Sequence, residues 1–540
     1  MRVRTKHNSQ LLIICLLAAA LLAPADAQQY PPNGPHIPSI TLTGGGPPPP
    51  EQPPPPGPSD VSSVWNMEIV GYNDLQGRSA YQPLIINQDG RQIAYIGHHN
   101  REPMLNSLTG QMEKNGTSIV DVTDPANTKY LAHIPTGSGR GEGGSQMVQV
   151  CSGTTLPSGD DGEWYLLRSY GSSAHEIWNV TDPLKPTQLT TVVDDLAGTH
   201  KNWWECDTGM AFLAGRRNND DWTGSNHLII YDLSDPARPK YIRDYGMPGQ
   251  QPGATSYIGH IEGGVGLHGA ISAGRLKNRI YMAHGTGSNG ILMIVDRLKL
   301  LTEFKNPRTP TEAEMLAPMV SHIVMSPDQG GHTAFPIFNQ PTPGFQTHPL
   351  KRNRDLLLVS SEAGRSNNCA SNYPPEELTQ GRSAPQLAFI VDVTHEISPW
   401  PLSTIRVQEG DYCARGGRHG VHSSSESFYP PYYGKLAIIA YFNAGIRVWD
   451  IRDPFAPHEL AYFIPAPNEN TVPTCSNAET REGGEFGFES PTSACQRVGV
   501  INNVEVDDRG LIYGTDRPGG GLHIVRLTGY ARDIVNLSSE

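Results

Sequence analysis

The stretch "GIRVWDIRDPFAPHELAYF" at residues 445–463 contains the pattern that decides the fold. Its first part is a short apolar and aromatic run that ends at Asp450, which is typical of a β-strand with a buried face. Asp453 and Pro454 follow, where a carboxylate can cap a turn and a proline ring fixes its backbone angle. Because a second apolar run comes next, the stretch predicts two antiparallel strands joined by a tight turn.

The same pattern recurs along most of the chain. The other copies are "TSIVDVTDPANTKYLAHIP" (117–135), "HEIWNVTDPLKPTQLTTV" (175–192), "LIIYDLSDPARPKYIRDY" (228–245), "GILMIVDRLKLLTEF" (290–304), "LAFIVDVTHEISPWPLSTI" (387–405) and "GLHIVRLTG" (521–529). A further pair of strands precedes each copy, as "GLHGAIS" (266–272) and "NRIYMAHG" (278–285) precede the fourth. About four strands in each of seven units predict an all-β fold, a seven-bladed β-propeller of four-stranded antiparallel blades, which leaves no long sheet edge exposed.

The blades can be assigned from the spacing of the copies. We expect the inner strands to begin near Gln82, Gln146, His200, His268, His332, His422 and Asn503. The last unit, residues 502–527, is short of an outer strand. The N-terminal segment "WNMEIVGY" (65–72) is expected to supply that strand and to close the ring.

Two of the copies carry the residues of a known repeat. The segments "LMIVD" (292–296) and "AFIVD" (388–392) resemble the repeat of the LVIVD-repeat β-propeller family. The resemblance covers nearly the whole folded region, and it implies the propeller fold without a catalytic signature. In "IWN" (177–179) and "IVR" (524–526) another residue replaces the aspartate of the repeat.

The first residues have the features of an export signal. Three basic residues precede an apolar run too short to span a membrane, and Ala25-Asp26-Ala27 matches a small-x-small cleavage site. We therefore predict a signal peptide over residues 1–27, cut after Ala27, and a secreted or periplasmic protein. The predicted domains are a Pro/Gly-rich disordered leader over 28–62, the propeller over 63–532 and a C-terminal tail over 533–540.

The charge and the cysteines narrow the functional classes. The chain has a formal charge of −13, and removal of the signal peptide, which carries three basic residues and one acidic residue, changes it to −15. Such a charge disfavours nucleic acid and anionic membranes as partners. We expect a monomer, without membrane insertion, that binds a small-molecule ligand or an extracellular protein or glycan.

An even number of cysteines remains after cleavage, which favours disulfides in an oxidising compartment. They are Cys151, Cys206, Cys369, Cys413, Cys475 and Cys495. Fifteen pairings are possible. Cys151 and Cys206 fall on adjacent inner strands and are expected to pair between blades. Cys475 and Cys495 bracket one insertion, and Cys369 and Cys413 belong to neighbouring loops; some of these thiols can also remain unpaired.

Histidines gather where the inner strands begin, at one mouth of the central channel. The four positions are His200, His268, His332 and His422. The second strand of a blade runs back towards the same mouth and ends there at His98, His284, Glu362 or Asp516. Neutral imidazole is a ligand for copper, iron and zinc, so the four histidines are candidate ligands of a transition metal. Glu362 and His284, with His98 and Asp516, are candidates for orienting those ligands.

Three interpretations of this mouth stay open on the sequence. The first is a metal site, which would make the protein a metal-dependent oxidoreductase or hydrolytic catalyst. The second is a metal-free pocket in which imidazoles bind a polar ligand. The third is a water-filled channel whose polar side chains satisfy one another. A competing functional class is a non-enzymatic extracellular module that recognises a protein or glycan on its loop face.

Overall fold

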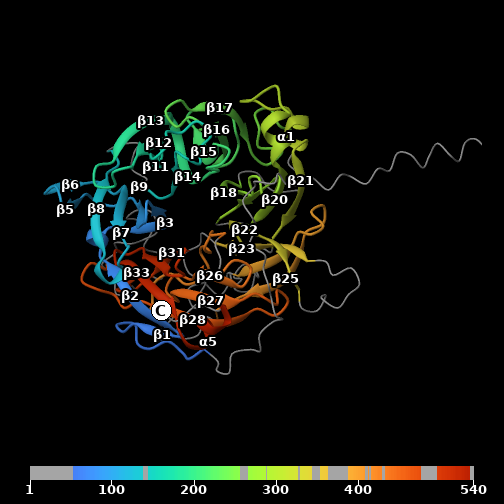
Figure 1. Ribbon diagram of the computed structural model, residues 1–540. Coiled ribbons are helices and arrows are strands. Elements are labelled where there is room, and N and C mark those ends of the chain that lie inside the picture. The colour runs from blue at the N-terminus through green and yellow to red at the C-terminus, as the bar shows by residue number, and fades with distance from the viewer. Residues whose placement is uncertain are drawn as a thin grey trace, which may run out of the picture.

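The computed structural model describes residues 53–137, 144–255, 265–286, 289–325, 329–342, 353–362, 387–407, 412, 415–428, 432–475 and 495–535. Seven antiparallel β-sheets are arranged as blades in a ring around a central channel (Figure 1). The predicted all-β, seven-bladed propeller is therefore confirmed. None of the helices in these ranges is long and apolar enough to cross a membrane.

The first five blades each come from one continuous stretch of chain, with the first strand innermost. Blade 1 has β3 (Ala80–Gln88), β4 (Arg91–His99), β7 (Thr117–Asp121) and β8 (Lys129–Ile134). Blade 2 has β10 (Val148–Ser152), β11 (Trp164–Tyr170), β12 (Ala174–Asn179) and β13 (Thr187–Val193). Blade 3 has β14 (Leu196–Trp204), β15 (Met210–Arg217), β16 (His227–Asp232) and β17 (Lys240–Tyr245). Blade 4 has β18 (Leu267–Ser272), β19 (Arg279–His284), β20 (Ile291–Asp296) and β21 (Met319–Val324).

The remaining blades complete the ring. Blade 5 has β22 (Gly331–Gln340), β23 (Arg354–Ser361), β24 (Ala388–Asp392) and β25 (Trp400–Ile405). Blade 6 has β26 (Leu436–Ala440), β27 (Ile446–Asp450), β28 (His458–Ile464) and β1 (Ser63–Trp65). Blade 7 has β31 (Ile501–Val506), β32 (Ile512–Asp516), β33 (Gly521–Leu527) and β2 (Met67–Asn73). Smaller elements are β5 (Met104–Asn106), β6 (Gln111–Glu113), β9 (Gly144–Ser145), α1 (Arg297–Thr302), α2 (Glu312–Leu316) and α5 (Gly529–Val535).

The N-terminal strands close the ring. Strand β2 pairs with β33, as predicted for the segment 65–72, and Figure 1 shows these two strands side by side. Strand β1 adds an outer strand to blade 6, which the sequence did not indicate. The inner segment of blade 6 begins at His422, whose backbone N–H donates to the Ala440 carbonyl at 3.0 Å.

The Asp-Pro turns form as the repeat predicts. In four of them the carboxylate accepts a hydrogen bond from the backbone N–H two residues later: Asp124 from Ala126, Asp182 from Leu184, Asp235 from Ala237, and Asp453 from Phe455. The core lies between neighbouring blades, where the faces of adjacent sheets pack together. Ile230 of blade 3, for example, belongs to the same buried cluster as Met282 of blade 4. Ring closure therefore buries the faces of every sheet, and it leaves the inner strand ends around the channel.

The ends of the described chain pack on the propeller. The Tyr462 hydroxyl donates to the Pro54 carbonyl at 2.9 Å, so the last part of the predicted 28–62 leader lies against blade 6. Helix α5 packs on the apolar cluster between blades 6 and 7, and its residue Val535 is buried. The folded region therefore includes residues on both sides of the predicted limits 63 and 532.

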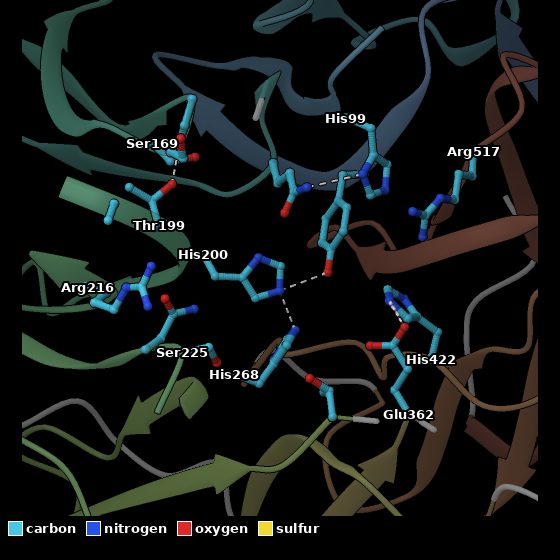
Figure 2. A pocket seen from close by; sticks show the side chains of 18 residues that line it. His99, Ser169, Thr199, His200, Arg216, Ser225, His268, Glu362, His422 and Arg517 are labelled. Atoms are coloured by element: carbon cyan, nitrogen blue, oxygen red, sulfur yellow. Dashed lines mark hydrogen bonds and ion pairs between the residues drawn. The ribbon is translucent and has the colours of Figure 1, made fainter. Parts of the chain in front are cut away.

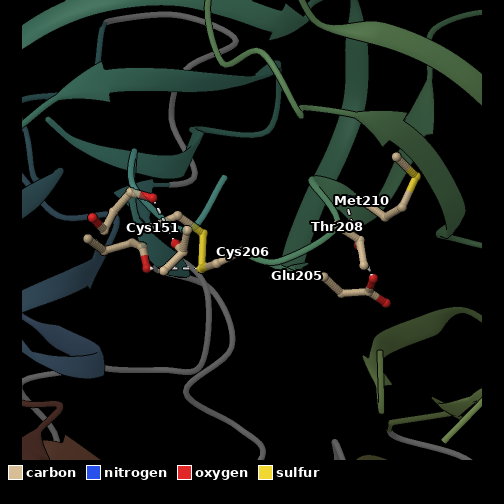
Figure 3. The surroundings of a disulfide bond; sticks show 8 residues. Cys151, Glu205, Cys206, Thr208 and Met210 are labelled. Carbon is tan, nitrogen blue, oxygen red and sulfur yellow. Dashed lines mark hydrogen bonds between the residues drawn. A yellow bond between two sulfur atoms is a disulfide. The ribbon is translucent and has the colours of Figure 1, made fainter. Parts of the chain in front are cut away.

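One disulfide joins two blades. Cys151 on β10 bonds to Cys206 beyond β14, with the Cα atoms 5.3 Å apart, as predicted (Figure 3). The β29–β30 pair (Thr474–Cys475 and Cys495–Gln496) sets Cys475 directly opposite Cys495, and a bond between them stays a prediction. Cys369 and Cys413 lie outside the described residues.

Candidate functional site

The inner strands change register where the histidines lie. In β18 the pairing steps from Leu267 opposite His284 to Gly269 opposite Ala283, so His268 is an extra, unpaired residue. The same shift occurs at His332 in β22 and around His200 in β14. A bulged residue is free of the ladder, and the bulge redirects its side chain. These three bulges direct the imidazoles into the channel.

The four histidines of blades 3 to 6 form a continuous row of rings. The centroid of His200 lies 4.3 Å from that of His268, and His268 lies 3.7 Å from His332. His332 in turn lies 4.3 Å from His422. Tyr81 of blade 1 faces both ends of the row, with centroid distances of 5.8 Å to His200 and 5.6 Å to His422. The structure therefore brings together all four histidines that the sequence singled out.

Hydrogen bonds fix the tautomers of two of these rings. His268 Nδ1 lies 2.7 Å from the His332 carbonyl, and His422 Nδ1 lies 2.6 Å from the Asn502 carbonyl. A carbonyl only accepts, so each Nδ1 carries the proton and, in the neutral ring, each Nε2 carries a lone pair. His268 Nε2 lies 2.6 Å from His200 Nε2. His332 Nε2 is buried and, within the described residues, has no hydrogen-bond partner.

Burial keeps the rings neutral. It lowers the pKa of His200 to about 4 and that of His422 to about 3, although the Glu362 charge opposes the shift in both. It also holds the pKa values of His268 and His332 well below 6.5, and the neighbouring histidines add to the effect. At neutral pH the imidazoles are therefore in the form that can bind a metal ion.

Glu362, at the end of β23, adds a carboxylate to the row. Its Oε2 lies 3.8 Å from His332 Nε2, and its Oε1 lies 3.7 Å from His422 Nε2. Burial alone would raise the pKa of this carboxyl, but Arg418, 2.7 Å away, and then His422 and Arg517 hold it below its usual value. The ligand atoms of His268, His332 and Glu362 all lie within 4.8 Å of one another, so this cluster can hold a metal ion.

A cavity of about 400 Å³ opens beside the row of histidines (Figure 2). Its lining is mostly polar and comes from the inner parts of all seven blades. The described lining residues are Tyr81, His99, Gln146, Ser169, Gly171, Ser172, Ala197, Gly198, Thr199, His200, Arg216, Ser225, Asn226, His268, Thr286, Glu362, His422 and Arg517. A small molecule in this cavity would contact the side chains of His200, His268, His422 and Glu362.

Three residues expected at the mouth lie elsewhere. His98 is buried within blade 1, where its ring contacts the Ser79 carbonyl and, at 2.6 Å, the Ser118 hydroxyl. Asp516 lies 3.8 Å from His523, and His284 is buried without lining the cavity. Successive residues of a strand face opposite sides of the sheet, so it is His99, not His98, that lines the cavity.

The inner-strand assignments in blades 1 and 7 are displaced by one residue. Tyr81 faces the histidines, whereas Gln82 turns towards blade 2 and accepts from the Val148 N–H at 3.5 Å. In β31 the register shift falls at Asn502, whose carbonyl holds His422, rather than at Asn503. The sequence offered no signal for Arg216, Arg418 or Arg517, which lie outside the repeated segments.

Comparison with known proteins identifies no family for this chain. No protein-family model and no curated protein sequence matches the chain. Among solved structures, the β-propeller domain of Cps50 (Swd1) from Myceliophteria thermophila is 10% identical, with 83% of this chain and 97% of that chain covered and a TM-score of 0.42. Hydrazine synthase from Kuenenia stuttgartiensis is 10% identical (84% and 97% covered, TM-score 0.44). Sqt1 from Chaetomium thermophilum is 9% identical (85% and 99% covered, TM-score 0.43). The strand topology itself makes the chain a seven-bladed β-propeller, with a histidine and glutamate cluster in its channel, and membership of the LVIVD-repeat family stays a prediction.

Proposed function

We propose that this propeller binds a transition metal ion, copper, iron or zinc, in its channel and presents it to a small molecule in the cavity. His268, His332 and Glu362 are the proposed ligands, and His200 and His422 flank them. The observation that carries the proposal is the convergence of the ligand atoms of His268, His332 and Glu362 within 4.8 Å of one another, together with the carbonyls that hold the Nδ1 protons of His268 and His422 and leave a lone pair on each Nε2. Such lone pairs face the Glu362 carboxylate and one another, an arrangement that a bound cation would stabilise.

The contacts argue against a plain polar channel. In a channel filled only by structure and solvent, buried polar groups satisfy one another. Here the buried Nε2 of His332 has no hydrogen-bond partner within the described residues, and the Nε2 of His422, whose Nδ1 proton is held by the Asn502 carbonyl, faces the Glu362 carboxylate at 3.7 Å. Neutral imidazoles with one carboxylate form a donor set that suits copper, iron and zinc. When bound, such an ion supplies Lewis-acid or redox chemistry.

The chain's own residues would set the geometry of this site. The carbonyls of His332 and Asn502 hold two imidazoles by their Nδ1 atoms, which is how ligating histidines are usually oriented. The Tyr81 hydroxyl lies 3.5 Å from His200 Nε2 and closes the blade 1 side of the cavity. We also propose that the protein works outside the cytoplasm, because disulfides such as Cys151–Cys206 persist in oxidising compartments.

The test is the metal content of the mature chain, purified without a histidine tag and measured by elemental mass spectrometry. We expect about one copper, iron or zinc ion per chain, and a loss of at least tenfold in His268→Gln and His332→Gln. His395→Gln is the matched control, because His395 is exposed on an outer turn of blade 5. No bound metal, even after reconstitution with each ion, would refute the proposal. Copper or iron would direct the next assays to oxidation, and zinc to hydrolysis.

A further inference from the structure

The cavity beside the histidines has the opposite charge from the chain as a whole. The chain carries a formal charge of −13. Among the described residues that line the cavity, Arg216 and Arg517 are cationic and Glu362 is the one carboxylate. Glu362 is itself paired with Arg418 at 2.7 Å. Because imidazoles add no negative charge in either protonation state, the cavity has a surplus of positive charge.

Arg216 supplies one side of this positive region. It is exposed on β15, opposite Gly198 of the inner strand β14, and it lines the cavity. Its neighbour Arg217 faces the other side of the sheet, where it is buried and paired with Asp244 at 3.1 Å. Its backbone belongs to the sheet, but its side chain makes no hydrogen bond or ion pair with the described part of the chain. A guanidinium held at a cavity wall in this way can bind a planar oxyanion with two parallel hydrogen bonds.

Arg517 supplies the other side. It is buried, and its Nη1 donates to Asn502 Oδ1 at 3.2 Å, which fixes the guanidinium next to the strand that holds His422. Figure 2 shows Arg216 and Arg517 on opposite sides of the cavity, with His200 between them. The positive charge of Arg517 also contributes to the lowered pKa values of His99, His200 and His422, which indicates that its field reaches the cavity.

Neutral donors line the wall between the charged groups. Those with a hydroxyl or amide side chain are Tyr81, Gln146, Ser169, Ser172, Thr199, Ser225, Asn226 and Thr286. Such groups can hydrogen-bond the oxygens of an anion, and they also tolerate the polar part of an organic ligand. The cavity thus combines positive charge, neutral donors and the histidine cluster within about 400 Å³.

We infer that the cavity binds a small organic carboxylate, with the anionic end between Arg216 and Arg517 and the other end towards the histidine cluster. The orientation of the ligand rests on the proposed metal site, whereas the preference for an anion rests on the arginines alone. Inorganic phosphate shares the charge but lacks the organic part that would reach the histidines. The two kinds of anion are therefore separated in the test.

The test compares propionate with propionamide, its neutral isostere, and with inorganic phosphate, by ligand-observed NMR titration of the full mature chain. Each probe is titrated into metal-loaded and chelator-treated protein. We expect propionate to bind at least tenfold more tightly than propionamide in both forms, and more weakly at higher salt. Arg216→Gln should lower propionate affinity about tenfold and leave propionamide unchanged. Arg238→Gln is the matched control, since Arg238 is an exposed arginine of the same blade, on an outer turn.

The outcomes separate the two proposals. Equal binding of the two probes, or an unchanged propionate affinity in Arg216→Gln, would overturn the anion site whatever the metal content. Tighter binding of inorganic phosphate than of propionate would overturn its assignment to an organic carboxylate. A preference for propionate in a chain that takes up no metal would leave the anion site standing and refute the metal site. Thermal unfolding of each variant checks that it is folded.

Discussion

Two layers of polar side chains occupy the channel, and they differ in how their groups are satisfied. The histidine layer consists of His200, His268, His332, His422 and Glu362. The lysine layer, built from the residues that follow along the inner strands, consists of Lys201, Glu426 and Glu505. In the lysine layer the Lys201 ammonium forms a buried ion pair with Glu426. The Glu505 carboxylate accepts from the Ser425 hydroxyl at 2.6 Å and from the Glu426 N–H at 3.1 Å.

The difference shows what separates a site from a structural network. Both layers are buried and polar, as the inner ends of propeller strands must be. In the lysine layer the main contacts join a donor to an acceptor, as Lys201 with Glu426 and Ser425 with Glu505, so these groups stabilise one another, although Oε2 of Glu426 has no partner among the described residues. In the histidine layer the buried Nε2 of His332 has no hydrogen-bond partner among the described residues, and the Nε2 lone pair of His422 faces the Glu362 carboxylate at 3.7 Å. Imidazole lone pairs without a donor distinguish this layer, and a metal ion is the ligand that they would suit.

The largest effect should come from breaking the lysine layer. Lys201→Met leaves Glu426 and Glu505 without their cation, and breaking a buried ion pair costs about 3–5 kcal/mol of unfolding free energy. Urea denaturation followed by tryptophan fluorescence measures this loss. In the same assay His332→Gln should change stability by less than about 1 kcal/mol, because its Nε2 makes no hydrogen bond among the described residues. Equal losses in the two variants would remove the distinction between the layers.

The double variant Lys201→Met/Glu426→Gln sharpens this prediction. It removes the cation and one of the two carboxylates, so less unpaired charge remains buried. We expect it to recover part of the stability that Lys201→Met alone loses. A double variant less stable than the single one would show that Lys201 acts through packing of its stem rather than through its charge.

A smaller loss of stability is expected from the disulfide. Cys151 and Cys206 are separated by 55 residues. Removing a disulfide that closes a loop of this length lowers the free energy of unfolding by about 2–4 kcal/mol, because the unfolded chain gains conformational freedom. The double variant Cys151→Ser/Cys206→Ser should therefore unfold at lower urea. Its metal content should stay that of the parent, because neither cysteine lines the cavity. A parallel loss of metal would show that the site depends on the junction between blades 2 and 3.

Periodicity predicted the ring, and bulges limited the prediction of the site. The repeated strand and turn pattern was enough to place seven blades, the closing strand of 65–72 and the four histidines. The predicted cavity residues Gln82 and His98 are each one position away from the residues that line the cavity. A single bulge, or one step along a strand, moves a side chain to the other face of the sheet. Counting residues from a repeat cannot detect where such a shift occurs.

Contacts between residues that are far apart in the sequence were the second limit on predicting the site. Glu362 was expected only to orient ligands, but its oxygens lie close enough to His268 and His332 for ligation. At Gly269 a Cβ would lie 2.3 Å from Cδ of Lys201, so the glycine makes room for that side chain. The arginines of the cavity come from positions without a repeat pattern. Only the folded chain brings these groups together.

The smallest effect concerns the pH dependence of the lysine layer. Burial raises the pKa of Glu505 to about 7, and Lys201 and Glu426 are the charged groups that face it. The folded state therefore binds more protons than the unfolded state, in which the pKa is near 4.5. The stability that this group contributes is present below pH 4.5 and is lost as the pH rises through about 7.

Urea denaturation at several pH values measures this effect. Between pH 5 and 6 the parent should lose about 1 kcal/mol relative to Glu505→Gln. The buried histidines change stability in the opposite direction, because their lowered pKa values make the folded state bind fewer protons. They are the same in both proteins, so the difference between the two isolates Glu505. Glu303→Gln, at an exposed position, should keep the slope of the parent. A Glu505→Gln slope equal to that of the parent would mean that Glu505 stays charged, and that the lysine layer holds two carboxylates against one cation.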